Sequence, residues 1–123
     1  MLDKILSFIA DMFTVKSVAC IRTENSYINA ASFRFVARRA GNTGYLIANI
    51  QLSAQMPTGT GLTKVGMLNA HLKDGMVATV PAQVGNATLL LQVQANGTIE
   101  IANLSGVAAP TGFYRAVIPL AFA

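Results

Sequence analysis

The sequence predicts an all-β fold, an antiparallel β-sandwich with jelly-roll character that follows one short N-terminal amphipathic helix. Roughly seven to nine short segments alternate apolar and polar residues with period 2, and Gly, Pro, Asn and Asp separate them at near-regular spacing. No strand–helix–strand spacing occurs, which disfavours a doubly wound α/β fold. Only residues 1–14 follow a helical period, so the predicted domain organisation is a helix over 1–14 and a sandwich over 15–123.

The N-terminal helix is expected to be an oligomerisation or packing segment. Its apolar side chains fall at heptad a and d positions or beside them, and these are Leu2, Ile5, Leu6, Ile9, Met12 and Phe13. Helices shorter than about 12–15 residues are marginal in water, so this helix needs a partner. The sequence leaves two partners open, namely the sandwich of the same chain and the same helix of neighbouring subunits.

Turn signals divide the first half of the sandwich into three strand-like runs. "VKSVACIRT" (15–23) is interpreted as one apolar strand, and "YINAASFRFVARRA" (27–40) follows it. "GNTG" (41–44) then turns the chain into "YLIANIQLSAQ" (45–55), which predicts a hairpin. On one face of these strands lie Phe33 and Phe35, and Leu46, Ala48, Ile50 and Leu52.

The most apolar part of the chain carries a second hairpin signal. Asn96-Gly97 favours a type I′ turn, because both central residues of that turn need a positive φ. Period 2 continues on both arms, so one face is expected to be buried, with Leu89, Leu91, Val93, Ile99 and Ile101.

The remaining runs are shorter or lie at the C-terminus. "LTKVGMLNAHL" (62–72) and "MVATVPAQV" (76–84) are strand candidates on either side of a Lys-Asp-Gly turn. "FYRAVIPLAFA" (113–123) is the final strand, and Pro119 places it at a sheet edge or a bulge because proline lacks the backbone donor.

The composition favours an assembly over a monomer. Of the 123 residues, 53% are hydrophobic and only 11% are charged, against about 25% charged in ordinary soluble domains. Large exposed apolar areas usually mark interfaces, so we expect an obligate oligomer or a part of a larger particle.

Charge and cysteine content disfavour several other classes. The net charge is +4, but the basic residues are scattered, so no nucleic-acid partner is expected. Cys20 is the only cysteine, and it is expected to behave as a small buried hydrophobe. The first segment is interrupted by Asp3, Lys4 and Asp11, so neither a signal peptide nor a membrane insertion is expected.

The sequence contains no pattern for enzymatic chemistry. Its carboxylates are not paired by spacing, and His71 is the only imidazole. "GTGLTK" (59–64) lacks the spacing of a phosphate-binding loop. No enzyme activity, cofactor or metal site is therefore expected.

The N-terminal helix, the all-β body, the hairpin "ANGTIEIAN" and the final strand "TGFYRAVIPLAFA" resemble small structural proteins of tailed bacteriophages, in particular receptor-binding-protein heads and related fibre or baseplate domains. The resemblance covers residues 86–123, and the first twenty residues by organisation only. It implies a homotrimer in the virion tail or baseplate, made in the host cytoplasm, with other phage structural proteins and a host-surface saccharide as partners. One departure is that the chain has no Trp and only three Tyr.

Binding is expected in loops, because the strand faces are committed to the core or to subunit contacts. The candidates are polar and aromatic residues close to turns, namely Arg38, Arg39, Asn42, Tyr45, His71, Lys73 and Asp74. The predicted function is host adsorption by a trimeric head domain. The alternative is a purely architectural capsid or baseplate module that binds only protein.

Overall fold

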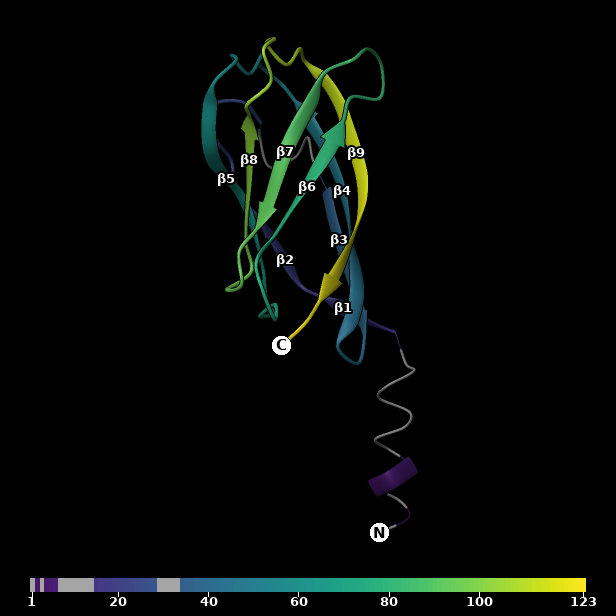
Figure 1. Ribbon diagram of the computed structural model, residues 1–123. Coiled ribbons are helices and arrows are strands. Elements are labelled where there is room, and N and C mark those ends of the chain that lie inside the picture. Colours follow the sequence, from purple (N-terminus) through teal and green to yellow (C-terminus); the bar gives the residue numbers. More distant parts are fainter. Residues whose placement is uncertain (1, 3, 7–14, 29–33) are drawn as a thin grey trace.

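The computed structural model describes Leu2 and residues 4–6, 15–28 and 34–123. In this part of the chain nine strands form (Figure 1). In order they are β1 (Lys16–Val18), β2 (Cys20–Arg22), β3 (Arg34–Ala40), β4 (Thr43–Leu52), β5 (Thr60–Leu68), β6 (Met76–Pro81), β7 (Thr88–Val93), β8 (Thr98–Asn103) and β9 (Gly112–Ala121).

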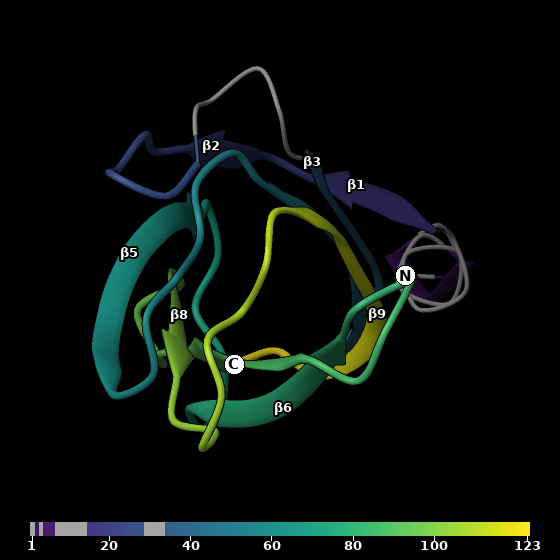
Figure 2. The ribbon, with the colours of Figure 1, turned by 90° about the horizontal axis from the view of Figure 1, so that it is seen from above.

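The strands form two antiparallel sheets that pack together. The four-stranded sheet has the order β1-β3-β4-β9, and the five-stranded sheet has the order β2-β5-β8-β7-β6. From above, the two sheets curve around a common interior (Figure 2). The predicted all-β sandwich is confirmed.

The inward side of each strand fills this interior, as the period-2 alternation predicts. Leu46, Ala48 and Ile50 of β4 are fully buried in one hydrophobic cluster with Leu91 and Ile101 from the other sheet. Burying a leucine or isoleucine side chain stabilises a fold by about 1.5–3 kcal/mol. This apolar interior is therefore the main force that holds the sheets together.

The run 15–23 is not one strand, which corrects the sequence-based prediction. It divides at Ala19 into β1, which pairs with β3, and β2, which pairs with β5 in the other sheet. The backbone carbonyl of Ala19 accepts a hydrogen bond of 2.8 Å from the amide of Asn69, which extends the β2–β5 register by one residue, so the chain already lies against β5 at Ala19. Alternation alone does not reveal such a change of sheet, because the period is the same in both sheets.

The β7–β8 hairpin is confirmed, but its turn is not type I′. No described residue other than glycine has a positive φ, so Asn96 does not adopt the required conformation. The amide of Gly97 donates to the carbonyl of Gln94 at 2.9 Å, and Gly97 has a φ of 96°. The amide of Gln94 donates to the carbonyl of Thr98, so the loop between them has three residues, 95–97. This loop is a type I turn followed by a bulge at Gly97.

The five-stranded sheet contains a Greek key. Strands β6, β7 and β8 follow one another through hairpin connections, and β5 lies beside β8. A jelly roll combines two Greek keys, and the described strands give one, so the jelly-roll detail is not confirmed.

Strand β9 is the edge of the four-stranded sheet, as Pro119 predicts. It pairs with β4 from Gly112 to Ala121. Beyond this ladder, isolated bridges join Tyr114 to Ala82 and Phe122 to Leu72. The final strand thus connects the two sheets near both of its ends.

The predicted N-terminal helix is only partly within the described residues. Leu2, Lys4, Ile5 and Leu6 have helical backbone, and their side chains are exposed in the single chain. Ile9, Met12 and Phe13 lie outside the described residues. A helix over 1–14 is therefore not confirmed, and its role in oligomerisation stays a prediction.

Replacement of Gly97 tests the close approach of the β7–β8 turn to β5. A methyl group at Gly97 would lie 2.4 Å from the carbonyl oxygen of Leu68 and 2.8 Å from that of Ala70, on a backbone with positive φ. Gly97→Ala is expected to lower the free energy of unfolding by about 2–4 kcal/mol. Gly61→Ala, where a methyl group meets nothing within 4 Å, should change it by less than about 0.5 kcal/mol. Urea denaturation of both variants measures this, and equal stabilities would contradict the observed turn packing.

Candidate functional site at the turn end of the sandwich

The structure brings the two predicted binding loops to one end of the sandwich, here called the turn end. This end carries the β3–β4 turn (41–42), the β5–β6 loop (69–75) and the β7–β8 turn (94–97), at the bottom of Figure 1. The amide of Phe122 donates to the carbonyl of Asn42 at 2.8 Å. The amide of Ala123 donates to the carbonyl of His71 at 3.0 Å, so the end of β9 lies between the two loops.

Further backbone hydrogen bonds extend this connection across the turn end. The amide of Lys73 donates to the carbonyl of Ala121 at 2.9 Å. The amide of Leu72 donates to the carbonyl of Ala95 in the β7–β8 turn at 2.8 Å. Because each loop is bonded to its neighbour through the backbone, the turn end is a preorganised surface and not a set of independent loops.

Arg39 lies in a defined position at the turn end. Its Nε donates to the carbonyl of Gly41 at 2.9 Å, and its guanidinium carbon lies 4.3 Å from the centre of the Phe122 ring. Gly44 makes this arrangement possible, because a Cβ there would lie 2.1 Å from the carbonyl oxygen of Arg38 and 2.8 Å from the Phe122 ring. The cation–π contact holds the guanidinium without using its N–H groups.

Beside Arg39 is a cavity of about 330 Å³ that we call the basic cavity. Its lining residues are Lys16, Arg39, Gly41 and Asn42. Lys16 and Arg39 are partners in the β1–β3 ladder. Among the residues that the structure describes, two cationic side chains and no carboxylate line the cavity, so this lining favours negatively charged groups.

The seven predicted site residues lie in three groups. Arg39 and Asn42 line the basic cavity. Arg38 and Tyr45 are cross-strand partners in the β3–β4 ladder, with Arg38 exposed and Tyr45 half-buried. The remaining three are exposed on the β5–β6 loop, and they are His71, Lys73 and Asp74.

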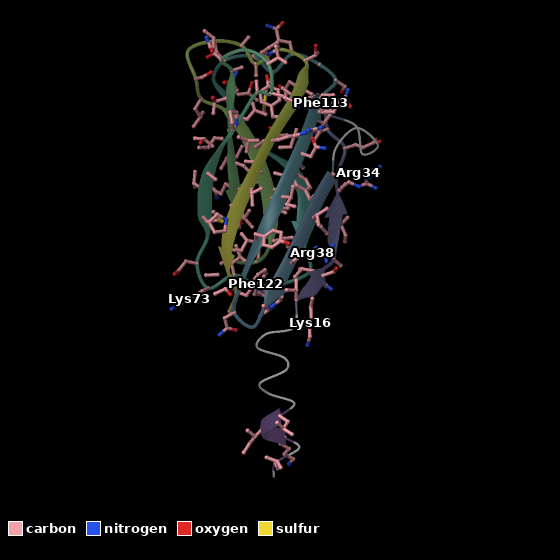
Figure 3. The ribbon with its side chains drawn as sticks, turned by 90° about the vertical axis from the view of Figure 1, so that its right-hand side faces the viewer. Lys16, Arg34, Arg38, Lys73, Phe113 and Phe122 are labelled. Atoms are coloured by element: carbon pink, nitrogen blue, oxygen red, sulfur yellow. The ribbon has the colours of Figure 1, made fainter. Side chains whose placement is uncertain are left out.

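Two residues of the site were not predicted from the sequence. Lys16 is 23 positions from Arg39 by their numbers, and only the β1–β3 pairing brings it there. Phe122 is 2% exposed and belongs to the hydrophobic core, and its ring also supports Arg39. Figure 3 shows Lys16, Phe122 and Lys73 at this end of the sandwich.

A second feature is the outer face of β3, β4 and β9, which points away from the core. Val36, Ile47 and Val117 are neighbours across the three strands and are 39%, 38% and 68% exposed. A parallel row contains Arg34 and Arg115. None of these three strands contains an acidic residue. This face is therefore apolar at its centre and basic beside it.

Cys20 is half-buried, so the expectation of a buried cysteine is met only in part. It packs against the hydrophobic core and borders a cavity of about 360 Å³ with Arg22, Arg34, Phe35 and Val36. Burial raises the pKa of its thiol to about 11, despite a backbone hydrogen bond with Met67 and the charge of Arg22, which both lower it. The thiol is thus neutral at neutral pH.

Comparisons with protein-family models, with curated proteins and with solved structures found no match to this chain. Across the described residues, no group of three or more His, Cys, Asp and Glu is placed to hold a metal ion. In the same part of the chain, no helix is long and apolar enough to span a membrane.

The raised pKa of Cys20 predicts slow thiol chemistry in the folded protein. Iodoacetamide at about pH 8 should react about a hundredfold more slowly than with the unfolded chain, because two pKa units separate the folded and unfolded thiol. The unfolded thiol loses its proton first as the pH rises, so this residue's contribution to stability is lost between pH 9.0 and about 11. Urea denaturation of parent and Cys20→Ala across this range isolates the effect. Equal alkylation rates in folded and unfolded chains would contradict it.

Proposed function

We propose that this chain is a non-enzymatic structural protein of a phage or prophage tail, and that it acts as a homotrimeric head domain in adsorption to a host-surface saccharide. In this role it is made in the host cytoplasm and is incorporated into the virion beside other structural proteins. The resemblance in sequence organisation and the β-sandwich support the proposal. The observation that carries it is the backbone-bonded turn end, where both predicted binding loops meet at the end of β9.

The side chains at and near the turn end suit sugar binding. Tyr45 offers an aromatic surface, and Arg38 lies directly opposite it across the β3–β4 ladder. Asn42 and Asp74 add amide and carboxylate groups on the adjoining loops. A sugar needs a flat apolar face for stacking and polar groups that orient its hydroxyls. Loops held by a rigid sandwich present such groups at little entropic cost on binding.

The outer face of the four-stranded sheet supports the assembly part of the proposal. An exposed row of three apolar side chains favours contact with a protein surface. Its arginines disfavour pairing of two identical faces, because like charges would then oppose one another. Contacts in a cyclic trimer join two different surfaces, so the same face of a second copy need not be its partner. The same row also favours the alternative, an architectural module that binds only protein.

Binding of host cells or glycans by two loop variants tests the adsorption role. Tyr45→Ala removes the stacking surface and Asp74→Ala removes a loop carboxylate, so each is expected to lower binding by about tenfold, the effect of losing one good contact. Thr111 is exposed and directly precedes β9, at the end of the sandwich opposite the turn end. Thr111→Ala is therefore the matched control and should bind like the parent. If both loop variants also bind like the parent after their assembly is verified, the predicted loop site is wrong and the architectural alternative gains.

Light scattering of the purified chain tests the assembly. The parent is expected to give about three subunits at micromolar concentration. Val117→Asp places a charge in the apolar row, and Val77→Asp makes the same change at 57% exposure on the other sheet. Loss of the trimer is expected only for Val117→Asp, because burying an unpaired carboxylate in an interface is strongly unfavourable. A monodisperse parent monomer would contradict the trimer, and a trimeric Val117→Asp would exclude this face as the interface.

A further inference from the structure

We propose that the basic cavity binds an anionic group, a carboxylate, sulfate or phosphate, carried by the saccharide to which the turn end attaches. The proposal rests on the proposed adsorption function and names the chemical class of its ligand. It assigns Arg39 as the principal anion-binding residue, with Lys16 as the second cation.

The guanidinium of Arg39 is positioned before any ligand arrives. Its Nε–H already donates to the carbonyl of Gly41, and its guanidinium carbon lies over the ring of Phe122. In the described part of the chain, no acceptor takes the N–H groups of its two terminal nitrogens. A planar pair of such N–H donors matches the two oxygens of a carboxylate, sulfate or phosphate. Because rotamer freedom is already restricted, little entropy remains to be lost on binding.

The neighbouring groups add charge and hydrogen-bonding capacity. Lys16 lines the same cavity from the adjacent strand and supplies a second positive charge. Asn42 is exposed at its rim, and its backbone carbonyl is bonded to the amide of Phe122, which keeps the turn in place. The carboxylate of Asp74 lies on the β5–β6 loop and does not line the cavity.

The shape of the charge distribution favours one anionic group on a sugar over a polyanion. A nucleic acid would need a stripe of cations that follows its backbone. The basic cavity instead has two cations in a space of about 330 Å³, at the small end of the range for small-molecule sites. The β5–β6 loop, which is bonded to the residues after β9, then remains for the neutral part of the saccharide.

Paired oligosaccharides that differ only in the anionic group test the proposal. The full-length parent is expected to bind the uronic-acid, sulfated or phosphorylated member at least about tenfold more tightly than its neutral counterpart. Arg39→Gln and Lys16→Gln should each remove most of this preference. Arg34→Gln carries the same charge change at the far end of β3 and should keep the preference. Added salt should weaken only the anionic member.

The outcomes separate this inference from the proposed function. Equal binding of charged and neutral members, or an Arg39→Gln variant that retains the preference, would overturn the anion site while adsorption to a saccharide stands. A second measurement, titration with inorganic phosphate and sulfate followed by the nitrogen-15 signal of Arg39 Nε, tests the cavity without any saccharide. A saturating shift of the Arg39 Nε signal in the parent that is absent in Lys16→Gln supports the anion site. If this shift is seen but no oligosaccharide binds, the anion site stands and the adsorption role fails. No shift at about 50 mM anion, well above ordinary weak-site affinities, would overturn the site.

Discussion

Backbone hydrogen bonds between the last strand, β9, and the loops of the opposite sheet hold the two ends of this sandwich closed. One edge of β9 pairs with β4 over its whole length. The other edge would normally present unpaired N–H and C=O groups to water. Near the two ends of β9 these backbone groups are paired instead, in isolated bridges between Tyr114 and Ala82 and between Phe122 and Leu72. The loops of the turn end therefore take their positions from β9, and the candidate site depends on the same bonds.

Local patterns predicted the local features of this fold. Alternation placed Leu46, Ile50 and Leu91 in the core, and all three are fully buried. Asn96-Gly97 predicted a hairpin, although the turn has another type because the amide of Gly97 closes a longer loop. The change of sheet at Ala19 was missed, because pairing between distant segments leaves no periodic trace in the sequence.

The sequence predicted only part of the candidate site, because the rest also depends on contacts between distant segments. Asn42 and His71 lie in loops that the sequence indicates by their turn-forming residues. These loops come together only because the residues that follow β9 donate hydrogen bonds to both of them. Lys16 joins Arg39 only through a ladder between distant segments, and Phe122 combines a core position with support for a cation. The opposite end of the sandwich is held differently. There the buried side chain of Asn103 donates to the carbonyls of Met56 and Val107, each at 3.0 Å.

Hydrogen exchange of individual amides tests the closure of the turn end by β9 most directly. The amides of Lys73, Phe122 and Ala123 belong to a loop and to the residues that follow β9, and exchange outside regular ladders is ordinarily fast. If β9 holds the turn end closed, these amides exchange nearly as slowly as that of Leu91 in the core. Exchange as fast as in an unstructured peptide would show that the loops open independently of β9, and the preorganised site would not exist.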